Sequence, residues 1–182
     1  MSYFIRAQKK RTFDIEYDNR FISVLRFPSW TSSNAIAELS DGTYQFTKNS
    51  FWKSQYDILK EGMPFGKISF NWKGHILLNL IDDSGLVPSS MEMDTKTTDE
   101  DYLSYTVKSK GVFKKRYELF QPKNPRPLIT LQPKSNWLKV NYQVTLHHSD
   151  IIPFTEESII TIMAFGVILL RKRQAAAGAA AG

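Results

Sequence analysis

A basic cluster between positions 108 and 116 is the first group of residues in this chain with a pattern suited to chemistry. Ammonium and guanidinium groups bind phosphate oxygens through charge-assisted hydrogen bonds, and clusters of them bind anionic membrane surfaces. Successive strand residues face opposite sides, so Lys114 and Arg116 share a face that Lys115 does not. The pattern predicts an anion-binding site for phosphate or for a phospholipid or phosphoinositide head group. Its five cations are Lys108, Lys110, Lys114, Lys115 and Arg116.

Two other interpretations of this basic cluster stay open. Outward lysines protect strands from aggregation, so the cluster could be a solvated hairpin without a ligand. Together with Lys9, Lys10 and Arg11, it could instead bind nucleic acid, with bases stacked on neighbouring tyrosines. A stacking platform needs its aromatic rings exposed on one face, whereas a β-rich core needs them inside, so we do not expect nucleic acid as the partner. The tyrosines concerned are Tyr102, Tyr105 and Tyr117.

The segment 82–101 has the opposite charge and no periodic pattern. It contains seven acidic residues and one lysine and is rich in Ser and Thr. A long stretch of this kind is typical of a mobile or a functional loop. Its carboxylates lack the spacing of an EF-hand calcium site, so a solvated loop is favoured. The alternative function that this acidic loop suggests is a scaffold that binds a protein partner. The carboxylates considered for calcium are Asp82, Asp83, Asp94, Asp99, Glu100 and Asp101.

Residues suited to catalysis are few. The histidines are His75, beside a predicted turn, and the adjacent pair His147 and His148, whose side chains diverge along a strand. This arrangement does not predict a shared metal or a proton relay. The sequence also contains neither a phosphate-binding glycine motif nor a G-x-S-x-G elbow. We therefore expect neither an enzyme nor a metal or cofactor site.

Composition supports one globular domain. The 182 residues are 42% hydrophobic and 23% charged, and the absence of cysteine excludes disulfides, thiol catalysis and most structural zinc sites. The net charge of +6 favours anionic partners. No apolar run of signal-peptide length opens the chain, so we expect a cytoplasmic protein that either stays in solution or associates peripherally with a membrane.

Strands are predicted along most of the chain. In 138–146, apolar residues alternate with polar ones, which is the period of a half-buried strand. The dipeptides Asp41-Gly42, Lys73-Gly74 and Lys110-Gly111 separate successive runs of this kind and predict tight antiparallel hairpins. About twelve candidate strands follow at the spacing of a sandwich or barrel.

A helix is predicted over about 155–173. Residues 159–170 are apolar except for Thr161, with a capping Thr155 before them and the bases 171–173 after them, which suit the negative end of a helix dipole. The apolar run is far shorter than the roughly 20 residues needed to cross a bilayer, so a buried helix is favoured over a membrane anchor of scramblase-like type. Residues 174–182 form a low-complexity Ala/Gly tail, which we expect to fray beyond the domain 1–173.

This helix decides the predicted architecture. A helix that is apolar all round must be covered all round, and one face of a flat sheet covers only a stripe of it. A closed sheet covers every side and also removes the exposed edges of the strands. We therefore predict a mainly β fold, a closed antiparallel barrel of about twelve strands around the C-terminal helix. The predicted plug residues are Ile159, Ile162, Met163, Phe165, Gly166 and Leu169.

The order of these patterns resembles the tubby C-terminal-like superfamily, which includes tubby-like, LURP-one-related and phospholipid-scramblase proteins. The likeness covers most of residues 1–173 and is strongest in 41–44, 66–80, 102–131 and 137–173. It implies a twelve-stranded barrel around a central hydrophobic helix. The LURP-one-like branch is the most similar, and it implies a non-enzymatic barrel of unassigned activity. Tubby-like relatives bind phosphoinositides through surface bases, but this chain has no segment that matches their signature residue by residue.

Overall fold

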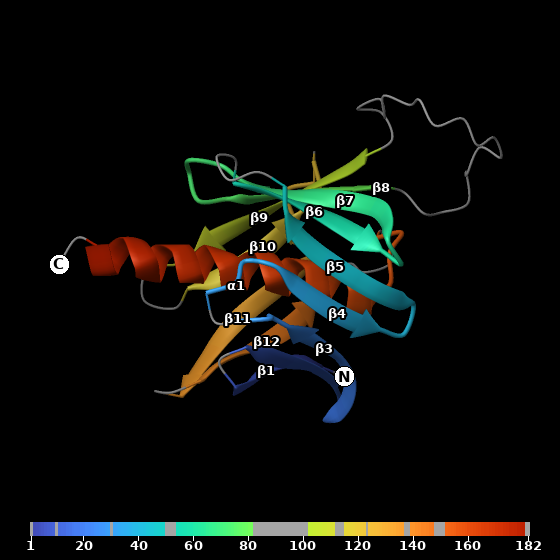
Figure 1. Ribbon diagram of the computed structural model, residues 1–182, viewed down its shortest axis with the longest axis horizontal. Helices are drawn as coiled ribbons and strands as arrows, with labels where there is room; N and C mark the ends of the chain where they lie inside the picture. The colour runs from blue at the N-terminus through green and yellow to red at the C-terminus, as the bar shows by residue number, and fades with distance from the viewer. Residues whose placement is uncertain are drawn as a thin grey trace.

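The computed structural model describes residues 2–9, 11–29, 31–49, 54–81, 102–111, 115–122, 124–136, 139–147 and 152–180. These residues form twelve strands followed by one helix, as predicted (Figure 1). The elements are β1 (Tyr3–Lys9), β2 (Thr12–Tyr17), β3 (Arg20–Arg26), β4 (Ala35–Leu39), β5 (Gly42–Lys48), β6 (Gln55–Lys60), β7 (Met63–Phe70), β8 (Ile76–Ile81), β9 (Tyr102–Lys110), β10 (Arg116–Phe120), β11 (Ile129–Asn136), β12 (Lys139–Leu146) and α1 (Glu156–Ala180).

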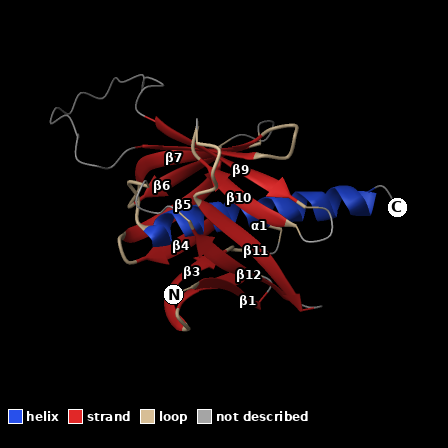
Figure 2. Ribbon diagram, turned by 180° about the vertical axis from the view of Figure 1, so that it is seen from behind, coloured by secondary structure: helices blue, strands red, loops and turns tan. Residues whose placement is uncertain are grey.

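The strands form a closed antiparallel barrel, which confirms the predicted fold class. Each strand pairs with its neighbours in the sequence, and β1 pairs with β12 to close the sheet, with Tyr3 opposite Val144 and Ile5 opposite Tyr142. Figure 2 shows the strands surrounding the helix. Closure leaves no strand edge unpaired, which removes the template for aggregation that a short exposed strand presents.

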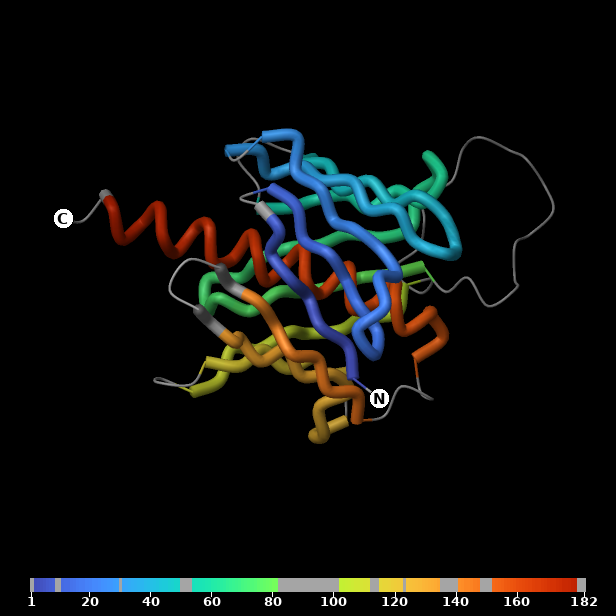
Figure 3. Tube along the Cα trace, turned by 90° about the horizontal axis from the view of Figure 1, so that it is seen from below, coloured from blue at the N-terminus to red at the C-terminus, as the bar shows by residue number. Residues whose placement is uncertain are grey.

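Helix α1 runs through this barrel, and its apolar segment is buried on every side (Figure 3). All the predicted plug residues are buried. Phe165 is fully buried, with its ring stacked on Phe46 at a centroid distance of 4.2 Å and on Phe27 at 5.9 Å. The plug is therefore enclosed by the protein itself, which confirms the prediction of a buried helix.

Gly166 lies where the barrel wall comes closest to the helix. A Cβ atom at this position would lie 3.1 Å from Cγ2 and 3.3 Å from Cδ1 of Ile76 in β8. Glycine costs about 1 kcal/mol relative to alanine in a helix interior. The close approach of Ile76 explains why glycine is accommodated here.

The end of the helix differs from the prediction. α1 continues to Ala180, so the fraying expected from Gln174 onward is wrong for residues 174–180. The bases 171–173 therefore do not lie in the last turn and cannot neutralise the negative end of the helix dipole there. Alanine is the strongest helix former, and the Ala-rich sequence continues the helix past the barrel wall.

Among the described residues, no helix is both long enough and apolar enough to cross a membrane.

Candidate functional site

The two ends of the barrel differ in the residues that they carry. We call the end where α1 begins the entry end and the end where α1 leaves the exit end, on the left of Figure 1. Because consecutive strands are antiparallel, alternate connections lie at the same end. The connections that follow β2, β4, β6 and β10 lie at the entry end, and those that follow β1, β3, β5, β7, β9 and β11 lie at the exit end.

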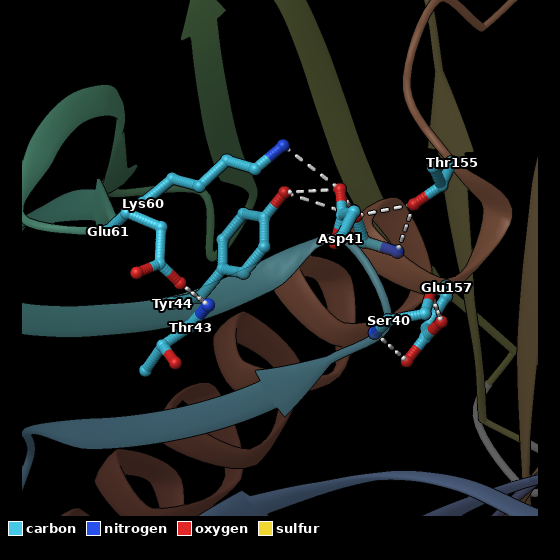
Figure 4. A network of polar contacts seen from close by, with 9 residues as sticks. Ser40, Asp41, Thr43, Tyr44, Lys60, Glu61, Thr155 and Glu157 are labelled. Atoms are coloured by element: carbon cyan, nitrogen blue, oxygen red, sulfur yellow. Dashed lines mark hydrogen bonds and ion pairs between the residues drawn. The ribbon is translucent and has the colours of Figure 1, made fainter.

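A polar network joins the start of the helix to the barrel at the entry end (Figure 4). The Oδ2 atom of Asp41 accepts hydrogen bonds from the hydroxyls of Tyr44 (2.9 Å) and Ser158 (3.0 Å) and forms an ion pair with Nζ of Lys60 (3.1 Å). Thr155 caps the helix as predicted, because its Oγ1 accepts a hydrogen bond of 3.2 Å from the Ser158 amide.

Both glutamates of the first helical turn bind the barrel as well. Glu157 is buried and accepts hydrogen bonds from the amide (3.2 Å) and the hydroxyl (2.6 Å) of Ser40. Glu156 accepts one of 3.0 Å from the hydroxyl of Tyr3. These contacts hold the helix start in place, which is a structural role.

These contacts also shift ionisation at the entry end. Burial lowers the pKa of Lys60, but Asp41 and Tyr44 outweigh it and raise the pKa above its ordinary value. Burial raises the pKa of Tyr44, with Asp41 adding to the shift and Ser158 opposing it. The pKa of Tyr3 is also raised, by burial and by its hydrogen bond to Glu156. The fold thus favours the protonated form of all three groups.

At the exit end, the three helix bases contact aromatic residues of the barrel. Nζ of Lys172 lies 3.7 Å from the ring centroid of Phe27, and the guanidinium of Arg173 lies 4.4 Å from that of Phe70. Both are cation–π contacts. Arg171 donates a hydrogen bond of 3.4 Å to the hydroxyl of Tyr142. Within the described part of the chain, neither Arg171 nor Arg173 forms an ion pair with a carboxylate.

The exit end is rich in basic residues. In sequence, its connections and the strand residue on either side of each contain no aspartate or glutamate, and neither does the helix from residue 171 onward. By the same definition, the described part of the entry end contains both carboxylates, in Asp18, Asp41, Glu61 and Glu156, and bases, in Arg20, Lys60 and Arg126. Positive charge is therefore concentrated at the exit end. The bases at the exit end whose positions the structure describes are Arg11, Arg26, Lys48, Lys73, Lys110, Lys115, Arg116, Arg171, Lys172 and Arg173.

The exit end also carries an exposed tryptophan in the connection after β7. Trp72 belongs to the described residues and is 89% exposed, with Nζ of Lys73 lying 5.1 Å from its ring. An exposed tryptophan beside a lysine is typical of side chains that lie at a membrane–water interface.

Three residues of the predicted basic cluster lie on the outer face of β9 and β10, namely Lys108, Lys110 and Arg116, and their charge is partly neutralised. Lys110 and Arg116 face each other across the strand pair and both form ion pairs with the buried carboxylate of Glu118, at 2.9 Å and 2.7 Å. Lys108 lies opposite Glu118 in the register, with its Nζ 5.0 Å from the ring of Phe120. Lys108 and Lys110 line a surface groove of about 670 Å³ together with Phe120 and the connection after β10.

The other residues that the sequence analysis considered as possible sites lie partly within and partly outside the described part of the chain. Lys115 is exposed, whereas Lys114, His148 and the whole acidic loop 82–101 lie outside the described residues. Nε2 of His147 lies 2.9 Å from the hydroxyl of Thr130, a contact within the barrel wall. In the described ranges, no group of three or more His, Asp or Glu side chains is placed to hold a metal ion.

No protein-family model, curated protein or solved structure matches the chain. The resemblance to the tubby C-terminal-like superfamily therefore stays a prediction, although the strand number and the central helix are those that it implies. The sequence reasoning missed the role of residues 171–173. A signal was present, because the Ala-rich stretch after them is a strong helix former and argues against a helix end at Arg173.

Proposed function

We propose that this barrel is a non-enzymatic module that docks on anionic membrane surfaces through its exit end. The observation that supports this proposal is the concentration of basic residues, together with the exposed Trp72, at the exit end. In this proposal the chain is a peripheral protein at the cytoplasmic face of a membrane. The entry end, which carries both acidic and basic residues, points away from the negatively charged lipids.

The exit end carries the basic and aromatic residues that docking on an anionic membrane requires. Each Lys or Arg close to an anionic leaflet contributes about 1 kcal/mol, and the attraction falls off within a Debye length. Lys73 and Lys115 are in the exit-end turns, and both are exposed. Trp72 adds an amphipathic ring that prefers the head-group level. Several weak contributions of this kind sum to a salt-sensitive affinity without a deep binding pocket.

The predicted basic cluster, on the barrel wall beside this surface, is the candidate subsite for a phosphate group. Lys108 and Lys110 line the groove beside Phe120, and Arg116 lies across the strand pair from Lys110. Because Glu118 already neutralises part of this charge, the cluster contributes less than its five cations suggest. Binding of a phosphate group in this subsite would make the protein prefer a phosphoinositide to phosphatidylserine.

Vesicle sedimentation tests the proposal. The purified chain is mixed with phosphatidylcholine vesicles that contain phosphatidylserine, a phosphoinositide or neither, at low and at high salt. Free inositol phosphate serves as a competitor, to separate head-group binding from surface attraction. We expect sedimentation with both anionic vesicles at low salt and its loss at high salt. Absence of sedimentation with anionic vesicles at low salt would refute the proposal.

A matched pair of charge reversals locates the surface. Lys73→Glu combined with Lys115→Glu changes the exit end, whereas Arg20→Glu combined with Lys67→Glu makes the same change in net charge away from it. Loss of two bases near the membrane predicts roughly 30-fold weaker binding for the first pair, and more once the acidic residues repel the lipid. The second pair should bind nearly as wild type does. Equal loss in both pairs would mean that net charge, not the exit end, drives binding.

A further inference from the structure

We infer that a pocket at the exit end, between α1 and the barrel wall, binds a single acyl chain with a carboxylate head, such as a long-chain fatty acid. The pocket has a volume of about 580 Å³, within the range of small-molecule sites. The pocket opens at the same end of the barrel as the proposed membrane surface, but the inference rests on the lining of the pocket and not on membrane docking. Its lining residues are Phe13, Thr31, Tyr142, Ile168, Arg171, Lys172, Ala175 and Ala176.

The helix side of the pocket comes from one face of α1. Residues spaced three and four apart share a helix face, which places Ile168, Arg171, Lys172, Ala175 and Ala176 in one row along the pocket. Ala175 and Ala176 belong to the part of α1 that continues past residue 173, where the sequence analysis expected the chain to fray. Their small side chains leave room next to the wall, and a larger residue there would occupy the pocket.

The opposite side of the pocket is mostly apolar. Phe13 is 8% exposed and belongs to β2, and Tyr142 is 2% exposed and belongs to β12. Apolar surface of this kind favours a hydrocarbon chain, since each buried methylene contributes about 0.8 kcal/mol. A head group alone would not make use of this lining.

The polar groups of the pocket select an anion. Arg171 has five N–H donors, and the hydroxyl of Tyr142 is its one hydrogen-bond partner among the described residues. Nζ of Lys172 lies over the Phe27 ring and donates a hydrogen bond of 3.3 Å to the backbone oxygen of Ser32. Burial lowers the pKa of Lys172, and a bound carboxylate would compensate this cost by favouring the charged form. Two cations beside an apolar pocket complement a fatty acid.

Titration with 11-(dansylamino)undecanoic acid tests this site in the absence of vesicles. The dansyl fluorescence of the probe should rise to saturation at one probe per chain, below its micellar concentration. Palmitate should displace the probe, and 1-hexadecanol should do so at least about tenfold less well, because it lacks the charge. No saturable binding, or equal displacement by the acid and the alcohol, would overturn the inference. Neither result bears on vesicle docking, which is measured separately.

Two matched pairs of variants test whether the probe binds in this pocket. Ala176→Phe fills the pocket and should weaken binding at least about tenfold, whereas Ala177→Phe puts the same ring on the next helix face and should not. Ala175→Leu replaces Ala176→Phe if the melting curve shows that the latter does not fold. Arg171→Gln should reduce the preference for acid over alcohol, and Arg173→Gln, on the face away from the pocket, should keep it. Equal effects within either pair would contradict the assignment.

Discussion

The entry end and the exit end of the barrel use polar residues in opposite ways. At the entry end, Asp41, Glu156 and Glu157 all accept hydrogen bonds from barrel side chains. At the exit end, Arg171 and Arg173 meet a tyrosine hydroxyl and an aromatic ring instead of carboxylates. Asp41 also has a counter-ion in Lys60, whereas Arg171 and Arg173 have none within the described part of the chain. The acidic groups around the helix start therefore serve the fold, whereas the two arginines keep their charge for the partner that we propose.

The largest expected effect comes from breaking the helix that connects the two ends. Ile162→Asp or Phe165→Asp places a charge where both side chains are fully buried. The cost of an unpaired buried charge, roughly 5 kcal/mol or more, is comparable with the whole stability of a domain. We expect insoluble or unfolded protein by circular dichroism. Soluble variants that melt cooperatively would show that the plug is dispensable.

Asp41→Ala tests the structural role of the entry end. The change leaves Tyr44, Lys60 and Ser158 without their shared acceptor and should lower the free energy of unfolding by about 1–3 kcal/mol. Urea denaturation measures this effect, and vesicle binding should stay as in wild type. At the exit end, Arg173→Gln removes a cation–π contact and should cost only about 0.5–1 kcal/mol. A greater stability loss from Arg173→Gln than from Asp41→Ala would reverse the comparison.

Exposed aromatic residues at the two ends provide a smaller contrast. Trp72→Ala at the exit end should weaken vesicle binding several-fold without changing the melting temperature, since the side chain is 89% exposed. Phe21→Ala is the matched control, because Phe21 is 62% exposed near the entry end. If both variants bind vesicles equally well, Trp72 makes no contact with the membrane.

The smallest expected effect is a difference in alkaline stability. The raised pKa values of Tyr3, Tyr44 and Lys60 mean that their stabilisation is complete below their ordinary values near 10 and is lost as pH rises above them. The lowered pKa of Lys172 acts with the opposite sign, because its burial cost is relieved as pH approaches the ordinary value of 10.5. The free energy of unfolding, measured in urea from about pH 8 to about pH 11, reports both slopes.

Two variants separate these contributions. Tyr3→Phe should reduce the loss of stability at high pH, and Lys172→Met should make that loss steeper. Burial also raises the pKa of Tyr142 to about 12, so some alkaline loss remains in both variants. Parallel pH profiles for both variants and wild type would show that neither group contributes.

Much of the fold could be predicted because its determinants are local. The alternation in 138–146 and the Gly turns specify strands and hairpins within a few residues. The apolar run 159–170 requires an enclosing sheet. The prediction of fraying at Gln174 was wrong, because it weighed low complexity above the helix propensity of alanine.

The candidate sites were harder to predict, since they depend on which residues the barrel brings together. The pairing of Lys110 and Arg116 with Glu118 follows from the strand register, which sequence periodicity does not supply. The contacts of Arg173 with Phe70 and of Arg171 with Tyr142 connect segments far apart in the chain. Which turns share an end of the barrel follows only from the closed antiparallel order.

The position of α1 after all twelve strands affects how the protein can be made. On the ribosome, the strands emerge before the helix that fills their interior, and β1 must wait for β12 before the sheet can close. Pairing between such distant segments is slow, and the unfilled sheet exposes apolar residues in the meantime. We expect the nascent chain to reach its native state only after translation has passed the helix, and to need chaperones until then.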